Sequence, residues 1–196
     1  MIKFNSKTAG ALAALTLAFA AAPAGAMPTI LTVTPAANGA PITLAEVQAA
    51  QQAWGNALVA ISTEYERNGR EAAARLAGQV LDSAYGYNLG PVLFKPTLAL
   101  APQTFRTTRE GALAYFVGGD KSFPNDTGFA LKGWRSVNVD TRNVVLAGNT
   151  AMSVGNVSMT DKNGKVTTVD KTWGYVRGPD GNLRIVLHHS SLPYTK

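Results

Sequence analysis

The stretch LHHSSLPY, residues 187–194, holds both histidines of the chain, His188 and His189, followed by Ser190 and Ser191. Imidazole and hydroxyl groups together could bind a metal ion, form a nucleophile with its base, or move protons. Successive side chains of a strand point to opposite faces, so His188 and His189 cannot easily hold one ion together. Alternation instead places His188 beside Ser190. We expect the two histidines and Ser191 to shuttle protons or support the site; the plainer alternative is that they satisfy hydrogen bonds at the end of a strand.

Other chemistries find little support in the residues. The chain has no cysteine and no third histidine, and it contains no H-x-H, H-E-x-x-H or D-x-D pattern. A metal ion would therefore need carboxylate ligands, several of which already have local roles in helix caps and turns. The G-x-S-x-G pattern of serine hydrolases is also missing. The sequence predicts no metal ion and no cofactor, with a metal site kept as an alternative.

The first 26 residues have the pattern of a bacterial signal peptide. Lys3 and Lys7 precede an alanine-rich apolar stretch, and Ala24 and Ala26 form an A-x-A cleavage pattern. The apolar stretch is short for a membrane span, although an uncleaved anchor helix is the alternative. We therefore expect cleavage near Ala26 and a periplasmic or secreted mature protein that is not attached to the membrane.

The charge pattern bears on the partners of the protein. The formal net charge is +6, but Lys and Arg are scattered singly and form no polybasic run. This pattern gives little reason to expect nucleic acid binding. A mildly positive surface can still favour small anions.

The elements that must position these residues follow from hydrophobic periodicity. Residues 27–41 are expected to be a flexible lead-in, and residues 42–196 a single domain. Thr43 and Glu46 form a capping-box pattern before a long amphipathic helix. The letters NGRE at 68–71 predict a break in that helix and the start of a second one.

A third, short helix is predicted in TTREGALAYFVGGD, with a capping box from Thr107 to Glu110. Tyr115 points away from the main apolar stripe of this helix, so it is either exposed or directed into a pocket. Four stretches rich in β-branched and aromatic residues follow, separated by turn signals such as NG and DG. Alternation along the last stretch places Ile185 on the face of His189. Helices before a meander of strands predict an α+β fold, with the helices on one face of a curved antiparallel sheet.

Longer motifs carry a family resemblance. The segments VLFKPT, TFRTTREGALAYFVGGD, DTGFALKGWRSV and TWGYVRGPDGNLRIVLHHSSLPY resemble the iota-class carbonic anhydrases, and most closely their metal-free branch. The resemblance runs from about Tyr85 to Tyr194. It implies reversible hydration of CO2 to bicarbonate in a nuclear transport factor 2-like cone, which is usually a homodimer.

The resemblance also implies a site. The threonine of FKPT is Thr97, the tyrosine of GALAYF is Tyr115, and the first serine of HHSS is Ser190; their hydroxyls would hold the substrate. Apolar walls for CO2 are expected from four aromatic residues: Phe94, Phe105, Phe116 and Trp173. Metal-dependent members often carry three histidines before the two serines. Here the first of these positions is Leu187, which removes a same-face pair with His189.

Three questions stay open at the level of sequence. The same fold could be a non-catalytic cavity protein that binds a small carboxylate or another metabolite, or a structural association domain. A metal-dependent enzyme that uses zinc or manganese is a further alternative. Finally, a neutral hydroxyl is a poor proton acceptor, so the base of the reaction is not identified.

Overall fold

The structure is a computed structural model that describes residues 39–196. The predicted signal peptide and residues 27–38 of the predicted lead-in lie outside the described residues. Residues 39–41 have no regular structure, and the Arg177 guanidinium donates hydrogen bonds to the carbonyls of Ala40 and Pro41. Within residues 39–196, no helix is long and apolar enough to span a bilayer. The elements in chain order are α1 (Leu44–Ala84), β1 (Leu93–Lys95), α2 (Arg109–Val117), the 3-10 helix η1 (Phe129–Leu131), β2 (Trp134–Ala147), β3 (Thr150–Asp161), β4 (Val166–Arg177) and β5 (Leu183–Ser191).

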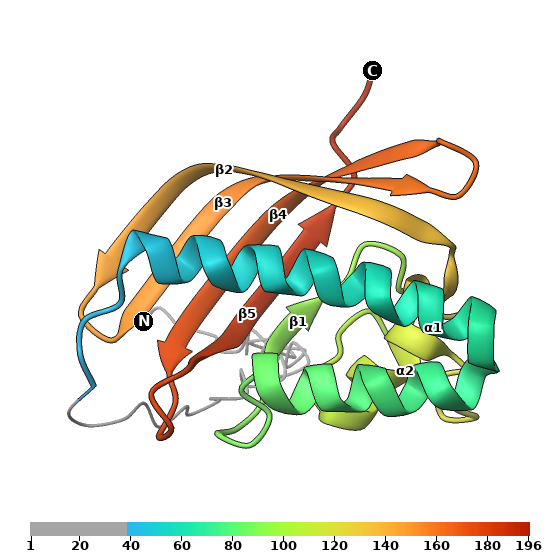
Figure 1. Cartoon of the computed structure of the whole chain (residues 1–196), viewed down its shortest axis with the longest axis horizontal. Helices are drawn as coiled ribbons and strands as arrows, with labels where there is room; N and C mark the ends of the chain where they lie inside the picture. The colour runs from blue at the N-terminus through green and yellow to red at the C-terminus, as the bar shows by residue number, and fades with distance from the viewer. Residues whose placement is uncertain (1–38) are drawn as a thin grey trace, which may run out of the picture. The chain divides into compact units, whose positions relative to one another are not determined.

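The first helix begins and breaks where the sequence predicts. The Thr43 amide donates to the Glu46 carboxylate at 2.8 Å, and the Glu46 amide donates back to Thr43 Oγ1 at 3.3 Å. Gly69 has φ 79° and ψ −177°, a conformation that glycine adopts at little cost and that interrupts the helix. The two legs of α1 on either side of Gly69 run back along each other (Figure 1). The predicted break at 68–71 is confirmed.

Helix α2, the third helix predicted from the sequence, is capped one residue later than predicted. Thr108, not Thr107, is the N-cap, and its hydroxyl accepts a hydrogen bond from the Gly111 amide at 3.2 Å. The third residue of the helix is then Gly111, which has no side chain to complete a capping box. Gly118 ends α2 with φ 62°, a backbone conformation that favours glycine at the end of a helix.

Five strands form one sheet in the order β1-β5-β4-β3-β2. Strands β2 to β5 are the predicted antiparallel meander, whereas β1 pairs with β5 in parallel. The prediction of an antiparallel sheet is therefore right for the four long strands and wrong for this short edge strand. The sheet is curved, and α1 lies across one of its faces (Figure 1). The α+β prediction, with helices on one face of a curved sheet, is confirmed.

A bulge interrupts the alternation of β5. Tyr175 pairs with Ile185 and Gly174 pairs with Leu187, so Val186 is an extra residue on β5. Ile185 is consequently in the core, on the same side as His188 and Ser190. The prediction that Ile185 shares a face with His189 is wrong, because one inserted residue reverses the alternation at this point.

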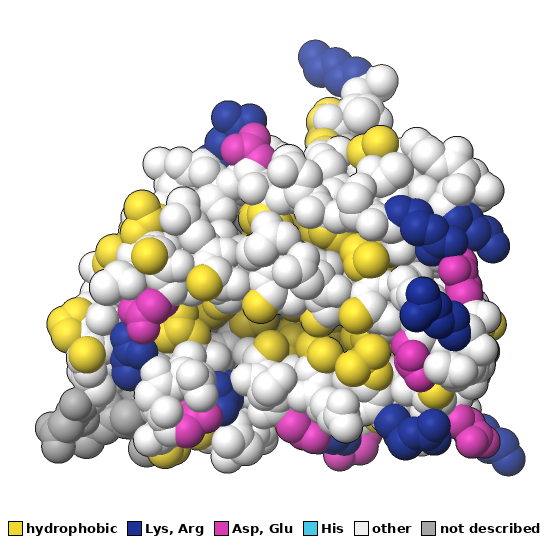
Figure 2. Space-filling view, viewed as in Figure 1, with side chains coloured by type: hydrophobic (Ala, Val, Ile, Leu, Met, Phe, Trp, Pro, Cys, Tyr) yellow, Lys and Arg dark blue, Asp and Glu magenta, His cyan; other side chains and the backbone are white. Residues whose placement is uncertain are grey.

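Figure 2 shows the face of the molecule on which α1 lies. Apolar side chains are visible between the two legs of α1, while basic and acidic side chains alternate around the rim. The basic groups on this face are interleaved with acidic ones, as their scattered positions in the sequence suggest. No single-sign patch dominates the described part of this face.

Candidate active site

A small cavity lies between the sheet and the helices, and the three predicted hydroxyl residues meet there. Thr97 follows β1, Tyr115 belongs to α2 and Ser190 to β5. The centre of a water molecule could move within about 10 Å³ of this cavity, which corresponds to room for about one water molecule. The lining residues are Trp54, Phe94, Thr97, Tyr115, Phe116, Phe129, Met159, Val169, Lys171, His188 and Ser190.

Two of the hydroxyls are directly bonded. Thr97 Oγ1 donates a hydrogen bond to Ser190 Oγ at 2.8 Å. The parallel pairing of β1 with β5 explains this approach, because it sets Lys95 beside His189 and so carries Thr97 to the end of β5. Since Ser190 accepts from Thr97, its own hydroxyl hydrogen is available to another acceptor in the cavity.

Tyr115 faces the cavity and not the solvent. Its ring is buried, stacked on Phe129 at 5.4 Å between centroids and set edge-on to Phe94 at 5.6 Å. Burial raises the pKa of the Tyr115 phenol above its ordinary value, so the group stays protonated at neutral pH. Tyr115 can therefore act as a hydrogen-bond donor, and the pocket alternative left open by the sequence is the correct one.

His188 lies deep in the core, at 2 % exposure, and both of its nitrogens are in contact. Nδ1 shares a hydrogen bond with the Tyr85 hydroxyl at 2.8 Å, and Nε2 lies 2.7 Å from Lys171 Nζ. The ring stacks on Phe94 with 4.4 Å between centroids. Burial, followed by the charge of Lys171, lowers the pKa of His188 well below its ordinary value. Both nitrogens of His188 are thus occupied by protein partners and its ring is neutral, so its geometry fits a supporting role.

The other polar residues of the HHSS motif lie elsewhere. His189 is exposed on the outer face of the sheet, and Ser191 is half-buried at the end of β5. In residues 39–196, no group of three or more His, Cys, Asp or Glu side chains could hold a metal ion. The predicted separation of the two histidines is confirmed.

Lys171 is the polar residue of the cavity wall that the sequence did not lead us to predict. It is 5 % exposed, and its Nζ lies 4.7 Å from the ring centre of Trp54 and 5.4 Å from that of Trp173. None of the ion pairs within residues 39–196 includes it. Burial lowers the pKa of Lys171 to about 7. The signal was alternation along β4, which puts this lysine on the inward face with Val169 and Trp173.

Two of the four predicted wall residues line the cavity and two do not. Phe94 and Phe116 are in the wall. Trp173 stands behind it, packed on Trp54 at 5.8 Å between centroids, because Lys171 occupies the wall position on β4. The prediction for Phe105 is wrong, since this side chain is 66 % exposed.

A buried ion pair explains the outward position of Phe105. The neighbouring residue Arg106 turns inward, and its guanidinium donates to both carboxylate oxygens of Asp126 at 2.8 Å. Adjacent residues of an extended segment point in opposite directions, so Phe105 must then face solvent. Periodicity alone could not show that an arginine takes the inward place, because its buried partner is 20 residues away.

A groove of about 600 Å³ adjoins the cavity and opens to solvent. It shares Thr97, Phe129, Met159 and Val169 with the cavity wall. Lys132 and Lys165 lie on the groove, both exposed. The groove, which Asp161 also lines, therefore offers a small molecule a path to the cavity past two lysines and one carboxylate.

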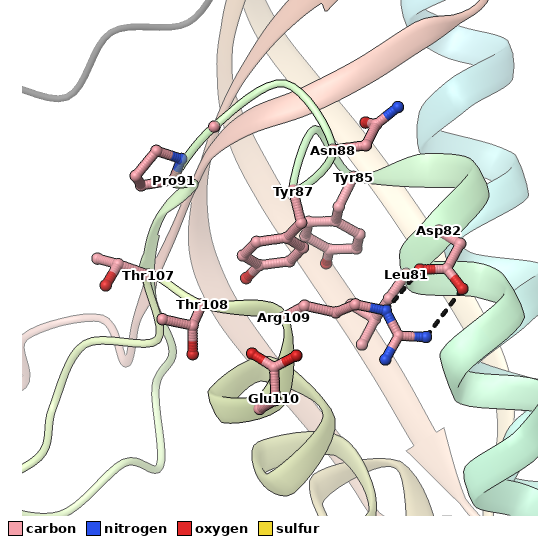
Figure 3. A pocket seen from close by; sticks show the side chains of 11 residues that line it. Leu81, Asp82, Tyr85, Tyr87, Asn88, Pro91, Thr107, Thr108, Arg109 and Glu110 are labelled. Carbon is pink, nitrogen blue, oxygen red and sulfur yellow. Dashed lines mark hydrogen bonds and ion pairs between the residues drawn. The ribbon is translucent and has the colours of Figure 1, made fainter.

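A second pocket, of about 590 Å³, lies at the C-terminal end of α1 and the start of α2. Tyr85 and Tyr87 stack in its wall, and Arg109 turns toward Asp82 (Figure 3). Arg109 Nε and Nη2 donate to the Asp82 carboxylate at 2.5 and 2.8 Å, so the charged groups of this pair are already satisfied. The smaller cavity is lined by three hydroxyl-bearing residues and by a lysine that has no carboxylate partner within residues 39–196, and it is the better candidate for chemistry.

Comparison with known proteins shows the family of the chain. A family model described as "Metal-independent carbonic anhydrase" matches residues 45–192. A protein of that name from Nostoc sp. is 62% identical over 161 residues, which cover 82% of this chain and 78% of that protein. A crystal structure of the iota-carbonic anhydrase from a cyanobacterium, complexed with bicarbonate, is 61% identical, with a TM-score of 0.79, and the match covers 83% of this chain and 99% of that one.

A more distant structure shares the fold alone. It is named for a calcium/calmodulin dependent protein kinase II association domain from Xanthomonas campestris, and it is 22% identical with a TM-score of 0.51 over 81% of this chain and 97% of that one. The family match, in contrast, spans both helices and all five strands, including the segments that surround the cavity. With that match and a relative at 62% identity, the chain belongs to the metal-independent carbonic anhydrases.

Proposed function

We propose that the chain hydrates CO2 to bicarbonate in the small cavity, where Thr97, Tyr115 and Ser190 hold the reacting oxygens. The observation that carries this proposal is that three hydroxyl-bearing residues from separate segments of the chain line one buried cavity, with Thr97 bonded to Ser190 at 2.8 Å. The bicarbonate complex of the cyanobacterial relative supports bicarbonate as the ligand.

The cavity has room for about one water molecule, so the two reactants need the mouth of the adjoining groove as well. The aromatic and aliphatic walls of these spaces suit CO2, which has no net dipole and needs no hydrogen bond. The hydroxyls on the other side can orient a water molecule toward the carbon atom, and positioning of this kind can supply several kcal/mol of the barrier. As the carbon is attacked, negative charge develops on an oxygen of CO2. Preformed donors at that oxygen act as an oxyanion hole does, and we assign this role to Tyr115 and Ser190.

Hydration without a metal ion is tested directly by removing metals. The purified protein is treated with a strong chelator, its residual zinc and manganese are measured by mass spectrometry, and CO2 hydration is followed by stopped flow. We expect the rate per protein to be unchanged by the treatment. A rate that disappears and returns on addition of zinc or manganese would instead establish the metal-dependent alternative. Absence of hydration with and without metal would favour the non-catalytic cavity protein.

We also propose that the protein is a homodimer that associates through the outer face of the sheet. Pairing between strands aligns one row of residues across all five strands on this face: Leu93, Leu187, Gly174, Met152 and Val145. Leu93, Met152 and Val145 are each about half exposed in the single chain. An apolar row on a sheet face is stabilised when a second copy covers it.

Charge in this row is expected to separate the dimer. Met152→Glu places a carboxylate at the centre of the row, and burying it against a second copy would cost several kcal/mol. We expect a dimeric mass for the wild type and a monomeric mass for the variant in sedimentation equilibrium at micromolar concentration. Leu44→Glu is the matched control, because Leu44 is equally exposed but lies in the first turn of α1. A wild-type protein that is monomeric at these concentrations would contradict the proposal.

A further inference from the structure

Hydration of CO2 releases a proton, and the hydroxyls of the cavity are poor acceptors for it. We propose that Lys171 accepts the proton of the attacking water, and returns it to bicarbonate in the reverse reaction. This assignment rests on the proposed placement of the substrate beside Thr97, Tyr115 and Ser190. It supplies the proton acceptor that the three hydroxyl groups do not provide.

The position of Lys171 meets the geometric requirement. Lys171 on β4 is the direct register partner of Ser190 on β5, so the two side chains leave the sheet side by side. Both side chains line the cavity. A water molecule held by the Ser190 hydroxyl therefore lies on the same side of the sheet as the amine, in a space with room for about one such molecule.

The surroundings of the amine disfavour its charged form. Nζ is enclosed by two indole rings and contacts His188 Nε2 at 2.7 Å, and no ion pair in the described residues gives it a carboxylate. A buried ammonium without a counter-ion loses much of its solvation, so the neutral amine is populated near neutral pH. Burial indeed lowers the pKa of Lys171 to about 7.

The other titratable groups around the cavity keep a constant charge in this range. Tyr115 faces the cavity from α2, and Tyr85 at the end of α1 contacts the far side of His188; burial raises the pKa of both phenols. The pKa of His188 is lowered, so its ring is neutral. Among the described residues that line the cavity, Lys171 is thus the group that changes charge near pH 7. His188 acts through Lys171, as a positioning residue that fixes the amine.

The step balances without a further reagent. The lone pair of the neutral amine takes one proton from water while the water oxygen forms a bond to the carbon of CO2. The electron pair of one C=O bond moves onto its oxygen, which becomes the negatively charged oxygen of bicarbonate. The hydroxyls and the new ammonium stabilise that charge until bicarbonate leaves through the groove. The ammonium then gives its proton to buffer by way of water in the cavity and the adjoining groove, which restores the amine.

The pH dependence of the rate tests this assignment. We expect kcat/KM of the wild type for CO2 hydration to rise with pH along a single ionisation near neutrality. Lys171→Met keeps the length of the side chain and removes the amine; we expect a loss of about 100-fold or more and a flat profile, since general base catalysis contributes at least that much. Lys121→Met removes an exposed lysine and should leave both the rate and the profile unchanged.

Three further measurements separate a base from other roles. Lys171→Arg keeps a positive charge that cannot be lost, so it should be as slow as Lys171→Met; a full rate with arginine would show that charge alone is needed and would overturn the proposal. Methylamine or ethylamine should restore part of the rate of Lys171→Ala, and not of Ser190→Ala. In the unaltered protein labelled with ¹³C-lysine, one Cε resonance should titrate near pH 7, a result that depends on no variant. A Lys171→Met enzyme that keeps the wild-type profile would refute the role of Lys171, even if loss of activity in Ser190→Ala upholds the proposed function.

Discussion

Replacement of Ser190 by alanine is expected to lower kcat/KM for CO2 hydration by about 100-fold or more. Ser190 accepts a hydrogen bond from Thr97, and in the proposed mechanism its own hydroxyl donates to the reacting oxygens. Loss of one preorganised donor to a developing oxyanion costs about 100- to 1000-fold in other enzymes. Stopped-flow hydration assays, with thermal unfolding measured in parallel, give the effect on the rate apart from any effect on folding.

The matched control for this prediction is next to it in the chain. Ser191→Ala removes the same hydroxyl from the following residue, which is half-buried outside the cavity wall. We expect this variant to retain activity within about twofold. If Ser190→Ala were equally active, the hydroxyl cluster would not be the catalytic centre.

The hydrogen bond between Thr97 and Ser190 predicts how substitutions of these two residues combine in their effect on activity. Thr97→Val keeps the shape of the side chain and removes its donor. Because the two hydroxyls act as one unit, the double variant should lose little more activity than Ser190→Ala alone. Independent effects that multiply would indicate that the two residues contact different parts of the substrate.

Lys171→Met is expected to make the folded protein more stable at pH 7, and the gain should vanish as the pH approaches 10.5. The pKa of Lys171 is about 7 in the folded protein and about 10.5 in an unfolded chain. Between these values the unfolded chain binds a proton that the folded protein does not, so the free energy of unfolding of the wild type rises with pH across this window. Below pH 7 the full cost of the buried ammonium applies.

The size of this effect follows from the two pKa values. At about 1.4 kcal/mol for each pKa unit, a lysine that titrates near 7 makes burial cost on the order of 5 kcal/mol at and below neutral pH. Urea unfolding of both proteins from pH 6 to pH 10.5 measures the difference, in which other titrating groups cancel. Lys121→Met should show no such dependence. A difference between Lys171→Met and wild type that is the same at every pH would mean that Lys171 titrates normally.

The expected gain in stability and the expected loss of activity of Lys171→Met are linked. A protein that keeps an uncompensated lysine in its core gives up stability that a methionine would restore. The same burial brings the amine into the range of pH in which it can exchange protons with water. We therefore expect the most stable variant at this position to be among the least active.

The features that the sequence predicted depend on neighbours along the chain. The capping box at Thr43 and the break at Gly69 are local, because each is decided within a few residues. The antiparallel meander follows from the turn signals between strands. The inward position of His188 and Ser190 is a matter of alternation over three residues.

The features that the sequence reasoning did not predict depend on partners far away. Phe105 lies outside because Arg106 pairs with Asp126. Strand β1 joins the sheet only through its pairing with β5, which comes more than 90 residues later in the chain. Lys171 is a separate case, since alternation along β4 does place it inward. A lysine on an apolar face is usually expected to reach solvent with its amine, and only the enclosing indoles show that this one does not.

The bulge at Val186 determines which residues of the HHSS motif face the cavity, and so bears on how the motif responds to a shift of one residue. A slip of one residue normally exchanges the inner and outer faces of a strand and would take the reactive groups out of the cavity. In HHSS each type is doubled, so the inner face receives a histidine and a serine two residues later in either phase: His188 with Ser190, or His189 with Ser191. The bulge selects the first pair while keeping Ile185 in the core. Because of this repetition, an insertion or deletion of one residue just before the motif would still place one histidine and one serine on the inner face.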